Sequence, residues 1–462
     1  MSVQLETTAH GMPLEHYGRN FIAGKWQFPK APFEFEIRNP LDSSISGVVP
    51  LSSRFDVESA VIAGKTALAG PWAKSTEREL RLNAFLDRVM ACSPELAHLQ
   101  SVESGLSMDD SSRLLAATVA AARGLVQSPA AGSRQTMRGV TGHILSWGLA
   151  FTEMVTSLLP SLIRGDTVVV KPSLRGSLTP VAFCVLAADA GLPGGVINLV
   201  QGTGVDVGGE LIRRRDLSSL HVRAGDRIIS QALRRSERSG VATYTLSAGG
   251  NVTIVGSDTD IDAARLADAI ATGVRVHNAG GPYGLPLLAL HRDQVGSVLN
   301  ELLPLLSRTV PAPLPTEPVR QRARDRVDAL VAVGAEVLLG GSSLPDDVEH
   351  RMGWRMRPTV VLLGEPGSQA VAAEQASSPL GPVLSIITWS HWHELTDVFN
   401  TQRASSGIAT VAHSVGTNAT GLPHGLVESA LSSRDAFNAA ILPAAWWGGV
   451  CDSPDTLEPT TD

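Results

Sequence analysis

Cysteine is scarce in this chain of 462 residues, and long apolar runs are absent. The three cysteines, Cys92, Cys184 and Cys451, lie far apart, so they make neither a C-x-x-C pair nor a disulfide framework. No run reaches the roughly 18 apolar residues that a membrane-spanning helix needs. The opening stretch, MSVQLETTAHGMPLEH, lacks a charged segment followed by an apolar one, so we expect no signal peptide. These absences predict a cytoplasmic protein that does not enter a membrane.

Basic charge is also in short supply. Lysine and arginine number 38 against 45 aspartates and glutamates, which gives a net charge of −7. Nucleic-acid-binding domains carry clustered positive charge, and the one short run, RRR at 213–215, stands beside Asp216 and suits a solvated helix end. We therefore expect no nucleic-acid partner. Only five basic residues are lysines, a bias that is typical of a G+C-rich bacterial genome and carries no functional information.

The rest of the composition is that of an ordinary globular protein, with 43% hydrophobic and 18% charged residues. A chain of this length exceeds one small core, so two or three domains are expected. Segments 55–70, 76–105 and 111–126 have the apolar spacing of helices, and the second is broken near Ser93 and Pro94.

From residue 140 onward, strand and helix patterns alternate. Strand patterns at 140–147 and 166–173 flank a helix at 154–165, and the alternation continues through 217–225. Such alternation predicts right-handed crossovers and a parallel sheet, as in a doubly wound nucleotide-binding domain. A second α/β series begins near residue 252.

Nine stretches, in this order, resemble landmarks of the aldehyde dehydrogenase superfamily. They are NFIAGKW, RNP with the following VPLSSRFDVESAVIAGKTA, ESG, GDTVVVKPS, AGLPGGVINLVQGTG, LSAGGN, HNAGG, LGPVLSI and WWGGVCDS. A single stretch of this kind is weak evidence, but nine in order span nearly the whole chain. The resemblance implies an aldehyde dehydrogenase-like α/β fold with two doubly wound α/β domains, one of dinucleotide-binding type and one of catalytic type.

The resemblance also implies a division of the chain. We expect an N-terminal tail at 1–16, a dinucleotide-binding-type domain at 17–124 and 138–250, a shortened bridging or oligomerisation segment at 125–137, a catalytic-type domain at 251–435, and a C-terminal segment with a polar tail at 436–462. Because the bridging segment and the C-terminal end are short, the usual oligomerisation elements are expected to be reduced. A homo-oligomer with an altered interface, or a protein partner, follows as the expectation.

The family's covalent mechanism needs three side chains, and each can be sought here. A cysteine thiolate adds to the aldehyde, an asparagine amide holds the oxyanion, and a glutamate activates water. In the pattern Asn-x-Gly-x-x-Cys, counting from Asn278 reaches Tyr283, and a register shifted by two reaches Gly281. The asparagine of Pro-Trp-Asn corresponds to Gly148, and the glutamate corresponds to Ser247. All three roles therefore lack their residue type.

Neither remaining nearby thiol is expected to substitute. Cys184 lies in the apolar stretch VAFCVLAA and is interpreted as a buried structural thiol, whereas Cys451 is interpreted as incidental. Tyr283 is a poor nucleophile at neutral pH because a phenol ionises near pH ~10, so we interpret it as filling the pocket.

Four residues match cofactor-binding positions of the family. Lys171 and Ser173 stand in the KPS motif, whose lysine binds the adenosine ribose in the family, and Trp147 and Gly225 match neighbouring landmarks. We interpret the four as a vestigial site. We expect no resident cofactor and at most weak binding of NAD or NADP.

Other positions in the same region depart from the family. Asp226 would bring negative charge to the phosphate site, with Arg223 and Arg227 as compensating charges, and Ser378 replaces a glutamate that binds the nicotinamide ribose. HWHE at 391–394 is not the HExxH motif, so no metal site is predicted.

Three functional hypotheses follow. The leading one is a pseudoenzyme, catalytically inactive for NAD(P)-dependent aldehyde oxidation, that acts as a scaffold or regulator or binds a ligand in the old cleft. The alternative is a repurposed enzyme that performs non-redox chemistry with Tyr283, Ser247 and His277 as an acid–base set. The second alternative is an active NAD(P)-dependent oxidoreductase acting on aldehydes.

Overall fold

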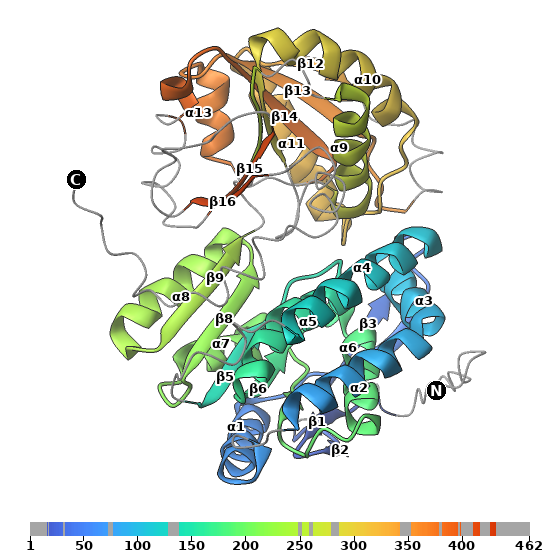
Figure 1. Ribbon diagram of the computed structural model, residues 1–462, viewed down its shortest axis with the longest axis vertical. Helices are drawn as coiled ribbons and strands as arrows, with labels where there is room; N and C mark the ends of the chain where they lie inside the picture. The colour runs from blue at the N-terminus through green and yellow to red at the C-terminus, as the bar shows by residue number, and fades with distance from the viewer. Residues whose placement is uncertain are drawn as a thin grey trace. The chain divides into compact units, whose positions relative to one another are not determined.

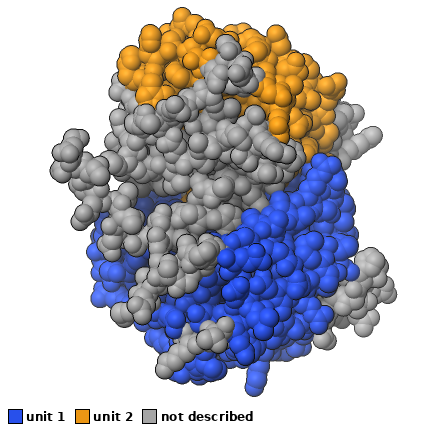
Figure 2. Space-filling view, viewed as in Figure 1, with its two compact units in different colours: residues 1–224, 228–245 blue, residues 225–227, 246–462 orange. Residues whose placement is uncertain are grey.

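Two seven-stranded sheets organise the chain in the computed structural model (Figure 1). The structure describes residues 16, 18–30, 33–72, 77–127, 138–247, 252–257, 262–278, 286–341, 353–377, 381–395, 398, 410–415 and 426–430. The chain divides into two compact units, shown in Figure 2. Unit 1 comprises residues 1–224 and 228–245, and unit 2 comprises residues 225–227 and 246–462. The expected division into α/β units agrees with these sheets, and the finer domain bounds remain predictions.

The first sheet has a parallel centre and an antiparallel edge. Its strand order is β2 (Lys25–Gln27), β1 (Asn20–Ile22), β7 (Ile197–Leu199), β6 (Thr167–Lys171), β5 (Val140–Ile144), β8 (Ser219–Ala224) and β9 (Ala242–Ser247). Strands β7, β6, β5 and β8 run parallel, whereas β1 pairs antiparallel with β7 and β2. A separate antiparallel pair joins β3 (Glu34–Arg38) to β4 (Ile45–Pro50).

Helices of unit 1 lie on both faces of this sheet. They are α1 (Arg54–Ala69), α2 (Arg78–Ala91), α3 (Ser93–Ser104), α4 (Met108–Val126), α5 (Ala150–Arg164), α6 (Leu178–Asp189), α7 (Gly209–Arg213) and α8 (Asp226–Ser239). Alternate residues of β5 face opposite ways, as in any strand. The side chain of Val140 approaches Gly64 of α1, whereas His143 contacts Ser157 of α5. Helices α1 and α5 therefore cover opposite faces, which is the doubly wound arrangement.

Local signals explain where several of these helices begin and end. Ser53 accepts from the backbone of α1 and forms a capping box with Asp56. Gly105 and Gly165 end α3 and α5 in the left-handed conformation that glycine adopts without strain. The break at Ser93 and Pro94 separates α2 from α3, as predicted.

The second sheet is parallel except at one edge. Its order is β12 (Glu336–Leu339), β13 (Thr359–Gly364), β14 (Val383–Trp389), β11 (Leu287–His291), β10 (Val252–Val255), β15 (Thr410–Val415) and β16 (Leu426–Ala430), and only β12 pairs antiparallel. Its principal helices are α9 (Ala263–His277), α10 (Val295–Arg308), α11 (Glu317–Ala332) and α13 (Gln369–Gln375).

Two cores flank the second sheet. Val383 and Ile387 of β14 pack in the core that contains α11 and α13, whereas Leu384 and Ile386 pack in the core that contains α9 and α10. The alternation follows from the two-residue period of a strand. The helices on the two faces are visible in Figure 1.

Candidate functional site

Three of the four candidate cofactor residues, Trp147, Lys171 and Ser173, stand at the carboxyl ends of parallel strands in unit 1, and Gly225 belongs to unit 2. Trp147 follows β5, Lys171 ends β6, Ser173 comes two residues later, and Gly225 follows β8. The strand order reverses between β5 and β8, because β5 leads to β6 on one side and β8 leads to β9 on the other. In open α/β sheets, ligands bind outside the carboxyl ends of strands at such a switch point. All four residues therefore stand at or just after the carboxyl end of a strand, and their part in cofactor binding stays a prediction.

Lys171 is almost fully buried at this edge. Its ammonium donates to the carbonyl oxygen of Pro172 over 2.8 Å, and burial lowers the pKa of Lys171 to about 8. Gly208 lies beside the Lys171 stem, because a Cβ added to Gly208 would make an ordinary van der Waals contact of 3.6 Å with Cδ of Lys171. An ammonium has three donors, so a ligand with hydroxyl oxygens suits the lysine end of the site.

Ser173 and Gly225 offer backbone groups. The Ser173 carbonyl accepts from the Gly176 N–H and from the Ser177 hydroxyl, which fixes the short 3-10 turn after β6. Gly225 is exposed between β8 and α8, and no heavy atom lies within 4 Å of where its side chain would be.

Gly148 occupies the position expected for the oxyanion-holding amide. Its φ is +114°, a conformation that side-chain-bearing residues rarely adopt, and no atom lies within 4 Å of an added Cβ. The residue therefore contributes only backbone groups between β5 and α5. Trp147 beside it is half-buried.

A buried ion pair lies at the same switch point. Arg223 near the end of β8 places its Nη1 3.9 Å from Oε2 of Glu153, which belongs to the first turn of α5. The Ser146 hydroxyl donates to Oε1 of Glu153 over 3.1 Å, and Arg223 also donates to the Thr156 hydroxyl. Burial raises the pKa of the Glu153 carboxyl, while the charge of Arg223 and the hydrogen bonds of Ser146 oppose that shift. The side chain of Asp226, which Arg223 was expected to compensate, lies outside the described residues, so that expectation stays a prediction.

Two histidines stack beside this ion pair. His143 of β5 pairs in register with His221 of β8, and their rings lie 4.6 Å apart and 4° from parallel. His143 hydrogen-bonds to Thr141 and to Ser157, each over 2.9 Å, and the Nε2 of His221 lies 3.1 Å from the Ser219 hydroxyl. Burial lowers the pKa of both rings, that of His221 to about 3, so both are neutral at physiological pH.

The residues expected at the old catalytic loop are only partly described. Ser247 ends β9, and its side chain lies outside the described residues, as do all of Gly281 and Tyr283 and the side chain of His277. Asn278 caps α9 with φ of +52°, and its amide nitrogen donates to the Pro313 carbonyl over 3.1 Å. The Asn278 side chain therefore supports the end of α9.

Cys184 is a core residue, as predicted. It is fully buried in α6, and burial raises the pKa of its thiol far above the ordinary value. A thiol held protonated in an apolar helix is neither a nucleophile nor a ready metal ligand. Cys92 joins α2 to α3, and burial also raises its pKa. Cys451 lies outside the described residues.

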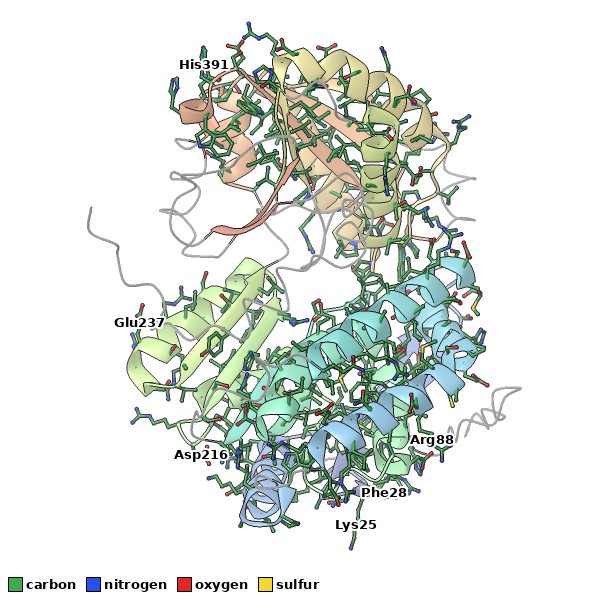
Figure 3. All side chains as sticks on the ribbon, in the orientation of Figure 1. Lys25, Phe28, Arg88, Asp216, Glu237 and His391 are labelled. Atoms are coloured by element: carbon green, nitrogen blue, oxygen red, sulfur yellow. The ribbon has the colours of Figure 1, made fainter. Side chains whose placement is uncertain are left out.

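Two further sequence interpretations concern the surface. Arg213 ends α7, and Arg214 donates to both carboxylate oxygens of Asp216, which Figure 3 labels. His391 and His393 stack at 5.7 Å, and the Glu394 carboxylate accepts from the backbone N–H of His391. Within the described ranges, no group of three or more His, Cys, Asp and Glu side chains is arranged to hold a metal. No helix in those ranges is long and apolar enough to cross a membrane.

Sequence reasoning missed the Glu153–Arg223 pair and the stacked histidines. Each had a signal, because Glu153 stands in the apolar stretch AFTEMVTSLL, His143 stands in the strand VTGHI, and His221 and Arg223 stand in the strand SLHVRA. A charged or titratable group in a buried element needs a partner, and two neighbouring strands that each carry one predict a pair.

The fold defines a two-unit α/β protein in which each unit is built around a mainly parallel sheet. The chain belongs to the aldehyde dehydrogenase family, whose model matches residues 26–417. The resemblance drawn from the nine stretches, and the fold that it implied, are confirmed.

Individual relatives agree with this assignment. The chain is 28% identical to the 3,6-anhydro-alpha-L-galactose dehydrogenase of Streptomyces coelicolor, over 82% of this chain and 81% of that protein. It is 25% identical to the alpha-ketoglutaric semialdehyde dehydrogenase of Bacillus subtilis, over 94% and 93%. A mutant of aldehyde dehydrogenase C from Pseudomonas syringae, solved with NAD+ and octanal, superposes with a TM-score of 0.74 at 23% identity, over 89% and 87%.

The family implies a dinucleotide, and one described residue at the carboxyl edge suits it. At the β6 end, the buried ammonium of Lys171 suits hydroxyl oxygens. The side chain of Asp226, expected beside the phosphates, lies outside the described residues. Dinucleotide binding therefore stays a prediction, and no chemical step is assigned to a cofactor.

Proposed function

We propose that this chain is an aldehyde dehydrogenase family member that does not oxidise aldehydes with NAD or NADP. One observation carries the proposal: no cysteine stands between Cys184 and Cys451, and Cys184 is locked in the core of α6. The covalent route needs a thiolate to form the thiohemiacetal from which hydride leaves. Without a thiol in the loop that follows α9, that route has no first step.

Two further positions support the proposal. Gly148 has no side chain to donate a hydrogen bond to an oxyanion, and losing one such donor costs about 3 kcal/mol of transition-state stabilisation. Ser247 replaces the expected general base with a hydroxyl, which does not accept a proton at neutral pH without an adjacent base. A chain that lost one group retains part of a mechanism, whereas losing three leaves no part of it.

The role that we propose is scaffolding or regulation, through a protein partner or a small ligand bound at the carboxyl edge of unit 1. Lys171 is the anchor for such a ligand, because its buried ammonium suits an acceptor-rich group. We also propose a cytoplasmic location, no resident cofactor, and a homo-oligomer with an altered interface or a protein partner. Light scattering of the purified chain, alone and in cell extract fractions, tests the assembly.

The proposal is tested with a panel of aliphatic, aromatic and amino aldehydes in the presence of NAD or NADP. We expect no formation of reduced nicotinamide above the enzyme-free blank. The relatives that this chain resembles are dehydrogenases, which is the ground for the opposing hypothesis of an active oxidoreductase. Turnover with any aldehyde of the panel establishes that hypothesis and removes ours.

Non-redox chemistry in the inherited site is the other alternative. It assigns an acid–base set to Tyr283, Ser247 and His277, whose side chains lie outside the described residues. It predicts an activity that Tyr283→Phe abolishes while the circular dichroism spectrum is unchanged.

A further inference from the structure

Unit 1 has a strongly basic surface that the proposed function does not use. The end of α7, the two residues after it and the second half of α8 form this surface. Nη2 of Arg235 donates to the carbonyl oxygen of Arg213 over 3.3 Å, so these two segments lie side by side. We call the region the arginine surface, and its six arginines are Arg213, Arg214, Arg215, Arg234, Arg235 and Arg238.

Like charges are crowded on the α8 side of the arginine surface. Arg238 follows Arg234 by four residues and Arg235 by three, and side chains at these spacings are neighbours on a helix. Arg234 and Arg238 are exposed, whereas Arg235 is half-buried against the end of α7. Like charges at such spacings repel each other, so a bound anion would relieve a repulsion that the fold leaves in place.

Two carboxylates on the α7 side are already committed to neighbouring basic groups. Glu210 pairs with Arg213 over 3.4 Å and with Arg214 over 3.8 Å. Asp216 accepts from Arg214 over 2.8 Å and pairs with Lys65 of α1 over 2.7 Å. None of these ion pairs reaches α8.

The exposed arginines farther along the surface lack such a partner. No carboxylate oxygen of the described residues lies within 4 Å of the guanidinium nitrogens of Arg215, Arg234 and Arg238. Glu237, labelled in Figure 3, is the acidic residue in the second half of α8, and it forms no ion pair with a described residue. A guanidinium presents planar donors that match a carboxylate bidentately. The arginine surface therefore suits an anion that carries carboxylates or similar oxygens.

The composition of the two helices favours one kind of anion. Neither α7 nor α8 contains an aromatic residue on which a nucleic-acid base could stack. No large apolar side chain among the described residues of 209–239 is exposed, so none is placed to insert into a lipid surface. An acidic protein segment needs neither kind of side chain.

The charge distribution of the chain supports the same choice. The arginine surface combines six arginines with three carboxylates, whereas the whole chain has a net charge of −7. An extended polyanion, such as a nucleic acid or a membrane, would also meet the acidic remainder of the chain, but a short acidic segment would not. Symmetric pairing of this face with the same face of a second copy would oppose arginine to arginine.

We propose that the arginine surface docks a short acidic segment of a protein partner, whose Asp and Glu carboxylates accept from Arg215, Arg234 and Arg238. The inference rests on the proposed function, because it specifies the protein partner named there and the surface that binds it. It involves neither Lys171 nor the carboxyl edge of unit 1.

Fluorescence anisotropy of the full chain with a short fluorescein-labelled poly-glutamate peptide tests the proposal. The wild type should bind saturably at about 50 mM salt and lose affinity as the salt rises, because exposed ion pairs are screened. The triple variant Arg215→Gln, Arg234→Gln and Arg238→Gln should bind at least about tenfold more weakly. Its three substituted side chains are exposed, so the fold should persist, and circular dichroism verifies it.

A matched control comes from unit 2. Arg265 of α9, Arg308 of α10 and Arg322 of α11 are exposed, and none of them forms an ion pair with a described residue. Changing all three to glutamine removes the same net charge from three separate helices. This control variant should keep its affinity for the peptide within about twofold of the wild type.

Four results would overturn the inference. The first two are a wild type that does not bind the peptide and a control variant that loses as much affinity as the arginine-surface variant. The third is tighter wild-type binding to single-stranded DNA or to phosphatidylserine vesicles than to the peptide. The fourth is a wild-type dimer, detected by light scattering, that the arginine-surface variant dissociates, because a second copy would then occupy this face.

The inference and the proposed lack of aldehyde oxidation fail separately. Aldehyde turnover by a chain that binds the peptide overturns the proposed function alone. Failure to bind the peptide, in a chain without turnover, overturns the inference alone.

Discussion

The stacked histidines of unit 1 predict a specific acid sensitivity. Both rings are buried and neutral, and the folded-state pKa of His221 is lowered from 6.5 to about 3. An unfolded chain protonates its histidines below about pH 6.5, whereas the folded chain does not. The unfolded state therefore binds more protons in this window, and folding stability is lost as the pH falls from 6.5 towards 3.

The magnitude follows from the linkage relation. At about pH 5, protonation stabilises an unfolded histidine of ordinary pKa by about 2 kcal/mol. The pKa of His143 is also lowered well below 6.5, so the two residues together account for a loss of about 4 kcal/mol between about pH 7.5 and pH 5. That is a large part of the stability of an ordinary domain.

Urea unfolding followed by circular dichroism, at both pH values, measures this loss. Other groups also titrate in this range, so the comparison is between the wild type and the double variant His143→Gln with His221→Gln. The wild type should lose about 4 kcal/mol more than the variant, and the single variant His221→Gln should remove about half of that difference. Equal losses in the wild type and the double variant would refute the assignment of neutral buried rings.

Three further predictions concern single sites. The Glu103 carboxylate accepts from the N–H groups of Leu178 and Thr179 and from the Thr179 hydroxyl at the start of α6. Glu103→Ala should therefore lower the free energy of unfolding, measured in urea, by about 3 kcal/mol. The exposed control Glu79→Ala should change it by less than about 0.5 kcal/mol. Arg326→Ala leaves the Glu374 carboxylate buried without its cationic partner and should lower the free energy of unfolding by about 3–5 kcal/mol. The double variant Arg326→Ala with Glu374→Ala removes both charges and should lose less. Equal losses in the two variants would contradict a buried charge pair. Cys184 should resist iodoacetamide in the native chain and react only on unfolding, and mass spectrometry that finds rapid native labelling of Cys184 would place it outside the core.

Much of the fold was predictable because its signals are local. Strand and helix periods, the Ser93–Pro94 break and the Gly165 cap each act within one or two turns. Helix α10 was missed for the same reason: Gly296 and Pro304 lower its local helix propensity. It forms because Val298, Leu302 and Leu306, spaced four residues apart, pack on the second sheet. Tertiary packing decided what local propensity did not.

The candidate site likewise has residues that the sequence could indicate and contacts that it could not. Trp147, Lys171 and Gly225 were named from the family resemblance, and their part in cofactor binding stays a prediction. The Glu153–Arg223 pair joins residues 70 positions apart, and the packing of α5 against β8 brings them together. A pairing that depends on sheet topology has no local signal beyond a charge in an apolar stretch.

The central claim is that no thiol of this chain supports aldehyde oxidation. The direct measurement is the initial rate of NADH or NADPH formation over the aldehyde panel, for the wild type and for a variant with Cys92, Cys184 and Cys451 all changed to alanine. We predict rates at the enzyme-free blank for both proteins. A wild-type rate above the blank that disappears in the cysteine-free variant would contradict the account.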